Sequence, residues 1–294
     1  MSDSLDVLQH RIGSADELKS VVRTMKVIAA SNITRYAQAV RAMDVYDETI
    51  RRGLAVVLRH DVLDAQVETG RVGVVVVGSD QGLVGQFNDE VSAVAHQLVA
   101  SVPQYKVWAV GERVADRLSD SGIPLAAQFD VPTTTHATTG LVAQLLSQIA
   151  PWLLAYPHAP LWVIHHKQRV GEAHAPIRLR LLPLDDVWQK TLVETPWPSR
   201  RLPEVMGDRL LTLRALVREY LFVSLYRAST ESMACENASR LAAMQRADKN
   251  IDELLGEFKR DYYLARQENI DEELFDVIAG FETQSSEDMG KKSA

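Results

Sequence analysis

The chain has 294 residues, of which 46% are hydrophobic and 24% charged, so it can bury a substantial core and has the composition of a soluble globular protein. Its formal net charge of −7 argues against a general nucleic-acid coat. The single cysteine, Cys235, cannot form an internal disulfide and fits a reducing compartment. The sequence has neither an apolar run of about 18 residues nor a basic start followed by an apolar stretch, so we expect no membrane span and no signal peptide.

The first predicted element is a long helix over residues 1–58. Apolar or small side chains recur there every three or four residues, which is typical of an amphipathic helix close to the heptad of a coiled coil. All eleven prolines lie between Pro103 and Pro203, so no helix breaker interrupts this stripe. Basic residues outnumber acidic ones between His10 and Arg41, which indicates either an acidic partner surface or, equally, a solvated helix face.

The middle of the chain, residues 70–200, alternates short strands with helices. Val72–Gly78 is a β-branched run bounded by glycine, which predicts a buried strand, and Asn88 is a candidate N-cap for the helix that follows. Further on we expect strands at 107–110 and 161–165, a helix at 138–149, and an edge strand at 177–182. This alternation is typical of an α/β layer domain. The proline-rich segment 195–203 is interpreted as the hinge into the final helix.

The last predicted element is a second long helix over residues 207–282. Its apolar stripe needs a partner, because an isolated helix of this length is not stable in water. The N-terminal helix is the obvious partner. The predicted fold is therefore α/β, with a long antiparallel coiled coil of the N- and C-terminal helices and an inserted Rossmann-like α/β domain. The polar residues 283–294 are expected to form a disordered tail.

A glycine-rich turn, with Gly78, Gly82 and Gly85, separates the first expected strand of the middle region from the helix after it. Such a turn can hold phosphate on backbone amides at a helix N-terminus. Its spacing matches neither the dinucleotide fingerprint nor the P-loop, and no Lys-Ser or Lys-Thr pair follows. We favour a structural turn, and a nucleotide-dependent enzyme stays open as a minor alternative.

The side chains best suited to metal binding are His165 and His166 at the end of a strand, with His158 and His174 nearby. Adjacent residues on a strand point to opposite faces, and no cysteine or clustered carboxylate completes a ligand set. We therefore expect surface histidines and no metal site. Cys235 has no histidine in its helical neighbourhood, so it is interpreted as a packing residue. The sequence predicts no catalytic residue and no cofactor.

Four stretches carry a family resemblance: Arg11–Ser14, Met25–Ser31, Ser79–Asn88 and Arg227–Met244. The first reads Arg-Ile-Gly-Ser, and the last contains Thr-Glu-Ser-Met-Ala-Cys-Glu-Asn-Ala-Ser-Arg. Together, in this order and spacing, they resemble the gamma subunit of F-type ATP synthases, the central rotor shaft. The resemblance covers both ends of the chain and the start of the α/β domain, whereas residues 100–200 match only in general pattern.

The resemblance implies a rotor stalk that couples ion flow through a membrane ring to nucleotide catalysis in an alpha–beta hexamer, without being catalytic itself. The coiled coil would stand in the hexamer, and the α/β domain would lie near the epsilon subunit and the membrane c-ring. The implied partners are thus the alpha, beta and epsilon subunits and the c-ring, with no nucleic acid and no direct membrane insertion. The implied location is the cytoplasmic face of a bacterial cell membrane, and the ion is either H⁺ or Na⁺.

The resemblance also assigns contacts to individual residues. It places Met25 and Lys26 against an acidic loop of the beta subunit, and Arg266 and Gln267 against loops of the hexamer. Signature residues near the domain and the rotor ring are Glu231, Glu236, Asn237 and Arg240. The apolar tip expected to turn in a sleeve consists of Leu274, Val277, Ile278 and Phe281.

The chain departs from the family pattern at several positions. Tyr263 replaces a usual asparagine and Asp271 a usual threonine, and Gln81 and Val84 change the glycine-turn motif. These departures suggest a divergent branch, such as an alternate F-type ATPase that works as an ATP-driven ion pump. A coiled-coil scaffold stays open as a third, minor reading.

Overall fold

The structure, a computed structural model, describes residues 2–59, 70–169, 172–184, 186–201 and 203–291. Contacts within the chain divide it into two compact units, one combining Met1–Val27 with Met244–Ala294 and the other formed by Ile28–Ala243. This division cuts both long helices, whereas the sequence suggested boundaries at the helix ends. Within the described part of the chain, no helix combines the length and apolar character that a membrane crossing requires.

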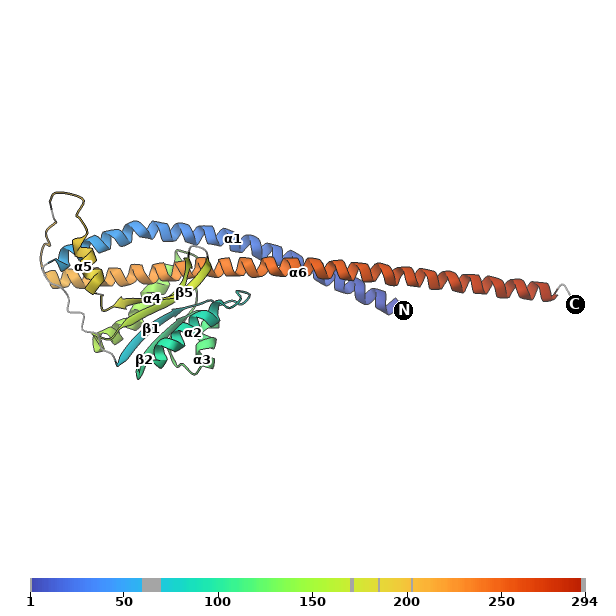
Figure 1. Cartoon of the computed structure of the whole chain (residues 1–294), viewed down its shortest axis with the longest axis horizontal. Coiled ribbons are helices and arrows are strands. Elements are labelled where there is room, and N and C mark those ends of the chain that lie inside the picture. The colour runs from blue at the N-terminus through green and yellow to red at the C-terminus, as the bar shows by residue number, and fades with distance from the viewer. Residues whose placement is uncertain (1, 60–69, 170–171, 185, 202, 292–294) are drawn as a thin grey trace. The chain divides into compact units, whose positions relative to one another are not determined.

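Two long helices, α1 (Ser2–Leu58) and α6 (Arg209–Lys291), contribute to both units (Figure 1). Helix α1 ends where the sequence predicted. At the start of α6, Asp208 is the cap, because its Oδ1 accepts a hydrogen bond from the Leu210 amide at 2.7 Å. The helix runs to Lys291, whereas the sequence predicted an end at 282 and a disordered tail. No proline follows Pro203, and Gly280, near the predicted end, costs only about 1 kcal/mol within a helix, so neither stops α6 at the predicted place.

The two helices pair antiparallel within each unit. In the first unit, Lys19 pairs with Asp252 and Lys26 with Asp248, so a later residue of α1 meets an earlier residue of α6. The two helices are also antiparallel in the second unit. Two side-chain hydrogen bonds show this, from Asn32 to Asn237 and from Tyr46 to Glu219.

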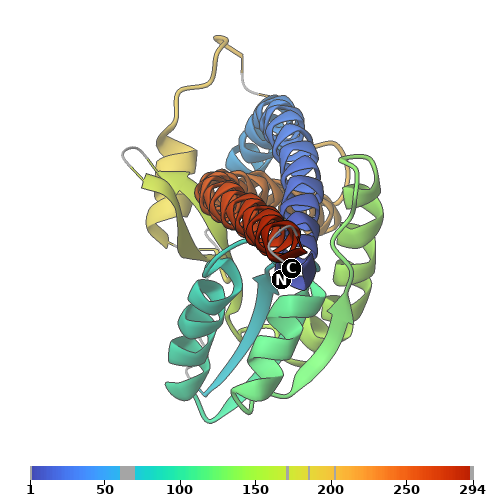
Figure 2. The same cartoon turned by 90° about the vertical axis from the view of Figure 1, so that its right-hand side faces the viewer.

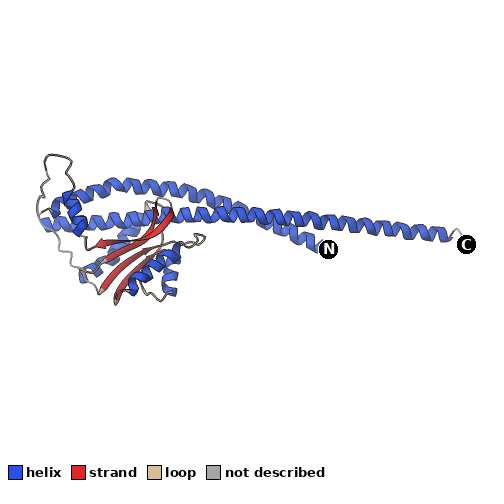
Figure 3. Ribbon diagram, viewed as in Figure 1, coloured by secondary structure: helices blue, strands red, loops and turns tan. Residues whose placement is uncertain are grey.

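The second unit contains one five-stranded sheet, drawn in red in Figure 3, with the strand order β3-β2-β1-β4-β5. Strands β1 to β4 are parallel, and β5 pairs antiparallel with β4. The position of β5 at the edge agrees with the sequence prediction, whereas its direction was not predicted. The strands are β1 (Arg71–Val77), β2 (Gln104–Val110), β3 (Leu125–Phe129), β4 (Leu161–Arg169) and β5 (Glu172–Leu182). Every residue of β1 after Arg71 is buried, which is typical of a central parallel strand covered on both faces.

Helices cover both faces of this sheet. Val74 and Val76 face a core shared with α2 (Phe87–Ala100) and α3 (Glu112–Asp120). Val75 and Val77 alternate to the other face, where the core includes side chains of α4 (Ala137–Ala155), α1 and α6. Figure 2 shows α2 in teal and α4 in light green on opposite sides of the strands. A short helix, α5 (Asp186–Glu194), follows the sheet.

The expected α/β architecture with two long helices is therefore confirmed, but three of its elements were not predicted: α3, β3 and α5. The role predicted for Asn88 is wrong. Asn88 lies inside α2, and Gln86 is at the N-cap position. The side-chain amide of Asn88 forms hydrogen bonds with Ser79 in the preceding turn and does not cap the helix.

Candidate functional site

In the first unit, the helix pair is joined by ion pairs. Lys26 Nζ lies 2.6 Å from Asp248 Oδ2, and both side chains are partly shielded from solvent. The hydrogen bond from Lys26 lowers the pKa of the Asp248 carboxyl below its ordinary value. Lys26, predicted to meet an acidic loop of a partner, thus already has an acidic partner within its own chain. Met25 beside it is half-buried.

Further along α6, apolar side chains stand in solvent. Arg266 and Gln267, the pair predicted to contact the hexamer, are both exposed. Around them and towards the C-terminus, large apolar side chains are exposed by 47–69%, namely Tyr263, Leu264, Ile270, Leu274, Phe275, Val277 and Ile278. A row of exposed large apolar residues is typical of an interaction surface. Of the four predicted tip residues, Phe281 lies outside the residues whose side chains the structure describes.

In the second unit, the signature stretch of α6 is packed into the protein. Glu231 accepts a hydrogen bond from Arg227 Nε at 2.9 Å, and its other oxygen lies 3.2 Å from His165 Nε2 on β4. Arg227 Nη1 lies 3.1 Å from Asp44 Oδ1 on α1. Burial raises the pKa of Glu231, but the hydrogen bonds from His165 and Arg227 outweigh burial and bring the pKa down to about 2. Glu231 is thus a largely buried carboxylate that ties α6 to β4 and, through Arg227, to α1.

The other signature residues are also internal. Glu236 and Asn237 are buried, and Arg240 donates to Glu236 at 2.7 Å. Burial raises the pKa of Glu236, and the Arg240 guanidinium opposes that rise. Asn237 donates to the Met233 carbonyl at 2.8 Å and accepts from Asn32 at 3.3 Å. The four signature residues therefore hold α6 in its packing and present little surface to another chain.

Ser79 and Asp80, at the start of the glycine turn, are bonded within the protein itself. Asn88 Oδ1 accepts from the Ser79 amide at 3.0 Å, and its Nδ2 donates to Ser79 Oγ at 2.9 Å. Asp80 accepts from the amides of Glu112 at 2.9 Å and Val131 at 2.8 Å. A phosphate in the turn would compete with the two buried bonds between Asn88 and Ser79 and would meet the Asp80 carboxylate. The geometry supports the structural reading of the turn over the nucleotide-binding one.

The strand histidines do not lie at the surface, contrary to the sequence prediction. Both His165 and His166 are buried, on opposite faces of β4 as their adjacency requires. His166 stacks on Phe87, with the ring centroids 4.0 Å apart, and its Nε2 lies 2.8 Å from the Phe87 carbonyl oxygen. Burial lowers the pKa of His166 to about 4, so the ring is neutral near pH 7. The sequence missed this environment because it depends on α2 covering β4.

Cys235 is buried against Val84 and Phe87, which agrees with its interpretation as a packing residue. Burial raises the pKa of its thiol to about 12, so the reactive thiolate is scarce at neutral pH.

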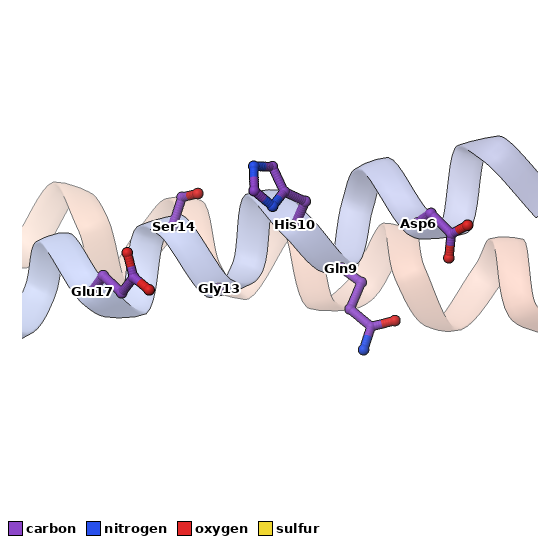
Figure 4. A pocket seen from close by; sticks show the side chains of 6 residues that line it. All are labelled: Asp6, Gln9, His10, Gly13, Ser14 and Glu17. Carbon is purple, nitrogen blue, oxygen red and sulfur yellow. The ribbon is translucent and has the colours of Figure 1, made fainter.

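The described residues also form concavities that were not predicted from the sequence. A cavity of about 690 Å³ lies over the edge of the sheet, lined by charged and aromatic side chains that include Arg51, Trp162, Lys167 and Trp188. A depression along α1 has an open floor at Gly13, where no atom would approach an added Cβ within 4 Å. Figure 4 shows its six lining residues, which all come from the turns of α1 itself: Asp6, Gln9, His10, Gly13, Ser14 and Glu17. The depression is the groove between turns of one helix.

Comparison with known proteins gives the family. The family model described as ATP synthase matches residues 4–283. The ATP synthase gamma chain of Frankia casuarinae is 28% identical over 95% of this chain and 97% of its own length, and that of Methylobacillus flagellatus is 26% identical over 93% and 97%. A chain of the Euglena gracilis mitochondrial ATP synthase, in a structure of OSCP, F1 and the c-ring, superimposes with a TM-score of 0.69 at 16% identity, covering 99% of this chain and 97% of that one. The chain belongs to the gamma-chain family of ATP synthases.

Proposed function

We propose that this chain is the central rotor shaft of a rotary ATP synthase or ATPase, a non-catalytic subunit that couples ion flow to nucleotide catalysis in an alpha–beta hexamer. The observation that carries the proposal is the pair of long helices, of which α6 exposes large apolar side chains between Tyr263 and Ile278. An enzyme would bury such residues around a pocket, whereas a shaft presents them to the sleeve that surrounds it. The family match over residues 4–283 supports the same role.

The exposed portion of α6 is the part that turns inside the hexamer in this proposal. Arg266 and Gln267 contact hexamer loops, and Met25 and Lys26 engage the beta subunit once the pair of Lys26 with Asp248 rearranges or is shared. The apolar tip, with Leu274, Val277, Ile278 and Phe281, runs in an apolar bearing. Apolar contacts suit rotation because they have no preferred direction that must be broken at each step.

The second unit is the end that receives torque in this proposal. It meets the epsilon subunit and the membrane c-ring at the cytoplasmic face of a bacterial cell membrane, with H⁺ or Na⁺ as the ion. Torque must pass from the sheet to the helices without slippage, which requires stiff internal joints. The largely buried bond of Glu231 to β4 and the partly exposed ion pair of Arg227 with Asp44 on α1 are such joints. The three nucleotide sites of the hexamer then contact different faces of one shaft. Their nucleotide affinities differ by the free energy that couples shaft orientation to nucleotide binding.

The departures at Tyr263 and Asp271 favour one variant of this function, an ATP-driven ion pump of the same architecture. Both residues are exposed on α6 and therefore change the surface that the hexamer meets. Inverted membrane vesicles distinguish the variants, because a pump acidifies or loads its lumen with Na⁺ on ATP addition and makes no ATP from an imposed gradient.

The contacts are tested by replacing Arg266 and Gln267 with alanine in the complex assembled with alpha, beta and epsilon subunits from the same genome. We expect ATP hydrolysis by this complex to fall about 5-fold or more, since a coupling of roughly 1 kcal/mol corresponds to that factor. The matched control replaces Gln97 and Arg113, which are exposed on α2 and α3, outside the portion of α6 assigned to the hexamer, and should leave ATP hydrolysis unchanged. Equal activity of the two double variants would remove the contact assignment.

A further inference from the structure

Three side chains from three different elements meet beside the buried face of β4. They are Glu90 on α2, His166 on β4 and His174 on β5, and one ligand atom from each lies within 4.8 Å of the other two. His166 Nδ1 lies 3.1 Å from His174 Nδ1 and 3.8 Å from Glu90 Oε2. All three belong to the second unit.

The register of the edge strands explains why the two histidines face each other. His166 pairs with Pro176 in the β4–β5 ladder. His174 lies two residues from Pro176 on the same strand, and residues two apart on a strand share a face. His174 is therefore the diagonal neighbour of His166, a separation that long side chains can bridge. Helix α2 covers this face and adds Glu90.

The spacing fits a small divalent cation. A tetrahedral zinc ion with bonds of about 2.0–2.1 Å holds its ligand atoms about 3.3 Å apart. Two of the three separations, 3.1 Å and 3.8 Å, lie on either side of that value, and the third is at most 4.8 Å. Small side-chain adjustments would bring the three atoms to bonding distance, with a water completing the tetrahedron.

Hydrogen bonds aim both rings. A carbonyl oxygen can only accept, so His166 Nε2 carries the proton that bonds the Phe87 carbonyl, and His166 Nδ1 is left with its lone pair towards His174. The other nitrogen of His174, Nε2, contacts Ser239 Oγ on α6. A metal-binding histidine characteristically hydrogen-bonds through its second nitrogen in this way, which fixes the tautomer and the ring orientation.

Without a metal, one self-consistent network remains. Ser239 donates its hydroxyl proton to His174 Nε2, His174 Nδ1 donates to His166 Nδ1, and Glu90 takes no part. When the proton of His174 is on Nε2 instead, the lone pairs of the two Nδ1 atoms face each other at 3.1 Å and repel. A cation bound between them removes this repulsion, because each Nδ1 atom then coordinates it. Glu90 then supplies the negative charge.

We propose that Glu90, His166 and His174 form a binding site for a first-row divalent transition-metal ion of the zinc type. Two imidazoles and one carboxylate are a ligand set that suits zinc. The site is reachable, because the Glu90 side chain is 37% exposed and His174 is half-buried. A bound ion links α2, β4 and β5 and, through Ser239, orients this corner of the sheet on α6. It is a structural clip within the second unit and is independent of catalysis.

The site is tested by titrating Zn²⁺ into the full-length, metal-stripped chain by isothermal calorimetry, with Co²⁺ absorption as a second probe of tetrahedral geometry. The wild-type chain should bind one ion tightly, and His174→Gln should weaken that binding about 100-fold. Glu90→Gln should weaken it about 10-fold or more, and its partly exposed position leaves folding unaffected. His96→Gln, which removes an exposed histidine from α2, is the matched control and should bind as the wild type does.

Thermal melting of the same variants gives the second readout. Zn²⁺ should raise the Tm of the wild-type chain and of His96→Gln, since a ligand that binds only the folded state stabilises it. The rise should be lost in His174→Gln and Glu90→Gln. The proposal is overturned if the wild type binds no stoichiometric ion, or if Glu90→Gln and His174→Gln retain wild-type affinity and the wild-type rise in Tm.

Discussion

Replacing Glu231 with glutamine tests the joint between the helices and the sheet. The pKa of Glu231 falls from an ordinary value of 4.5 to about 2, and at 1.36 kcal/mol per pKa unit this corresponds to about 3 kcal/mol of folding stability near pH 7. Removing one member of a buried charged network also leaves its partners uncompensated, which costs roughly 3–5 kcal/mol. Arg227 keeps Asp44 at 3.1 Å, so we expect the lower end, about 3 kcal/mol.

The assay is urea unfolding followed by tryptophan fluorescence. All five tryptophans lie between Trp108 and Trp197, so the signal reports the second unit. The matched control is Glu48→Gln in the same unit, which removes an exposed glutamate paired with Arg52 one helical turn away. Exposed pairs of this kind contribute about 0.3–0.5 kcal/mol. Similar small losses for both variants would refute the reasoning.

The pH dependence of the free energy of unfolding provides a second test of the same prediction. Because the folded pKa of Glu231 is depressed, its contribution is fully present above pH 4.5 and is lost as the pH falls towards 2. The stability difference between wild type and Glu231→Gln should therefore shrink over that window. A difference that stays constant from pH 5 to about pH 2 would contradict the assignment.

Two further predictions concern the glycine turn. Asn88→Ala removes both hydrogen bonds to Ser79 and leaves the buried backbone amide of Ser79 without an acceptor. We therefore expect the free energy of unfolding to fall by about 2 kcal/mol in the same urea assay. A fall of less than about 0.5 kcal/mol would mean that these bonds are dispensable. Gly78→Ala places a Cβ 2.4 Å from Val114 Cβ, and such overpacking should cost about 2 kcal/mol or more. Gly82→Ala is its control, because no atom lies within 4 Å of an added Cβ there, and equal midpoints for the two glycine variants would rule out the close-packing argument.

The long elements could be predicted from the sequence because their signals are local. The absence of proline before Pro103 and after Pro203 leaves α1 and α6 uninterrupted, and the valine run of β1 marks a strand buried on both faces. Strand β3 escaped prediction because it has five residues, none of them fully buried, and so lacks a clear apolar pattern. Helix α3 escaped because it is only nine residues long.

The candidate sites likewise combine features that are local in the sequence with features that depend on the fold. The i, i+4 pair of Arg227 and Glu231 is visible in the sequence, but its partners His165 and Asp44 come from other elements and depend on the packing of the sheet. The prediction of surface histidines holds for the exposed His158 but failed for His165 and His166 for the same reason, since the burial of His166 is set by a helix some eighty residues earlier in the chain. The hexamer contacts of Arg266 and Gln267 came from family resemblance, and they stay predictions.

The central claim, that this chain is a rotor, is tested most directly by watching it turn. Cys235 is the only cysteine and is buried, so Asp116→Cys on the exposed side of α3 provides a single accessible labelling site. The alpha–beta hexamer assembled with this variant is fixed to a surface, and a bead is attached at that site. We predict that ATP drives one-way rotation of the bead in three steps per turn. A complex that hydrolyses ATP while the bead only fluctuates about one angle would contradict the rotor account.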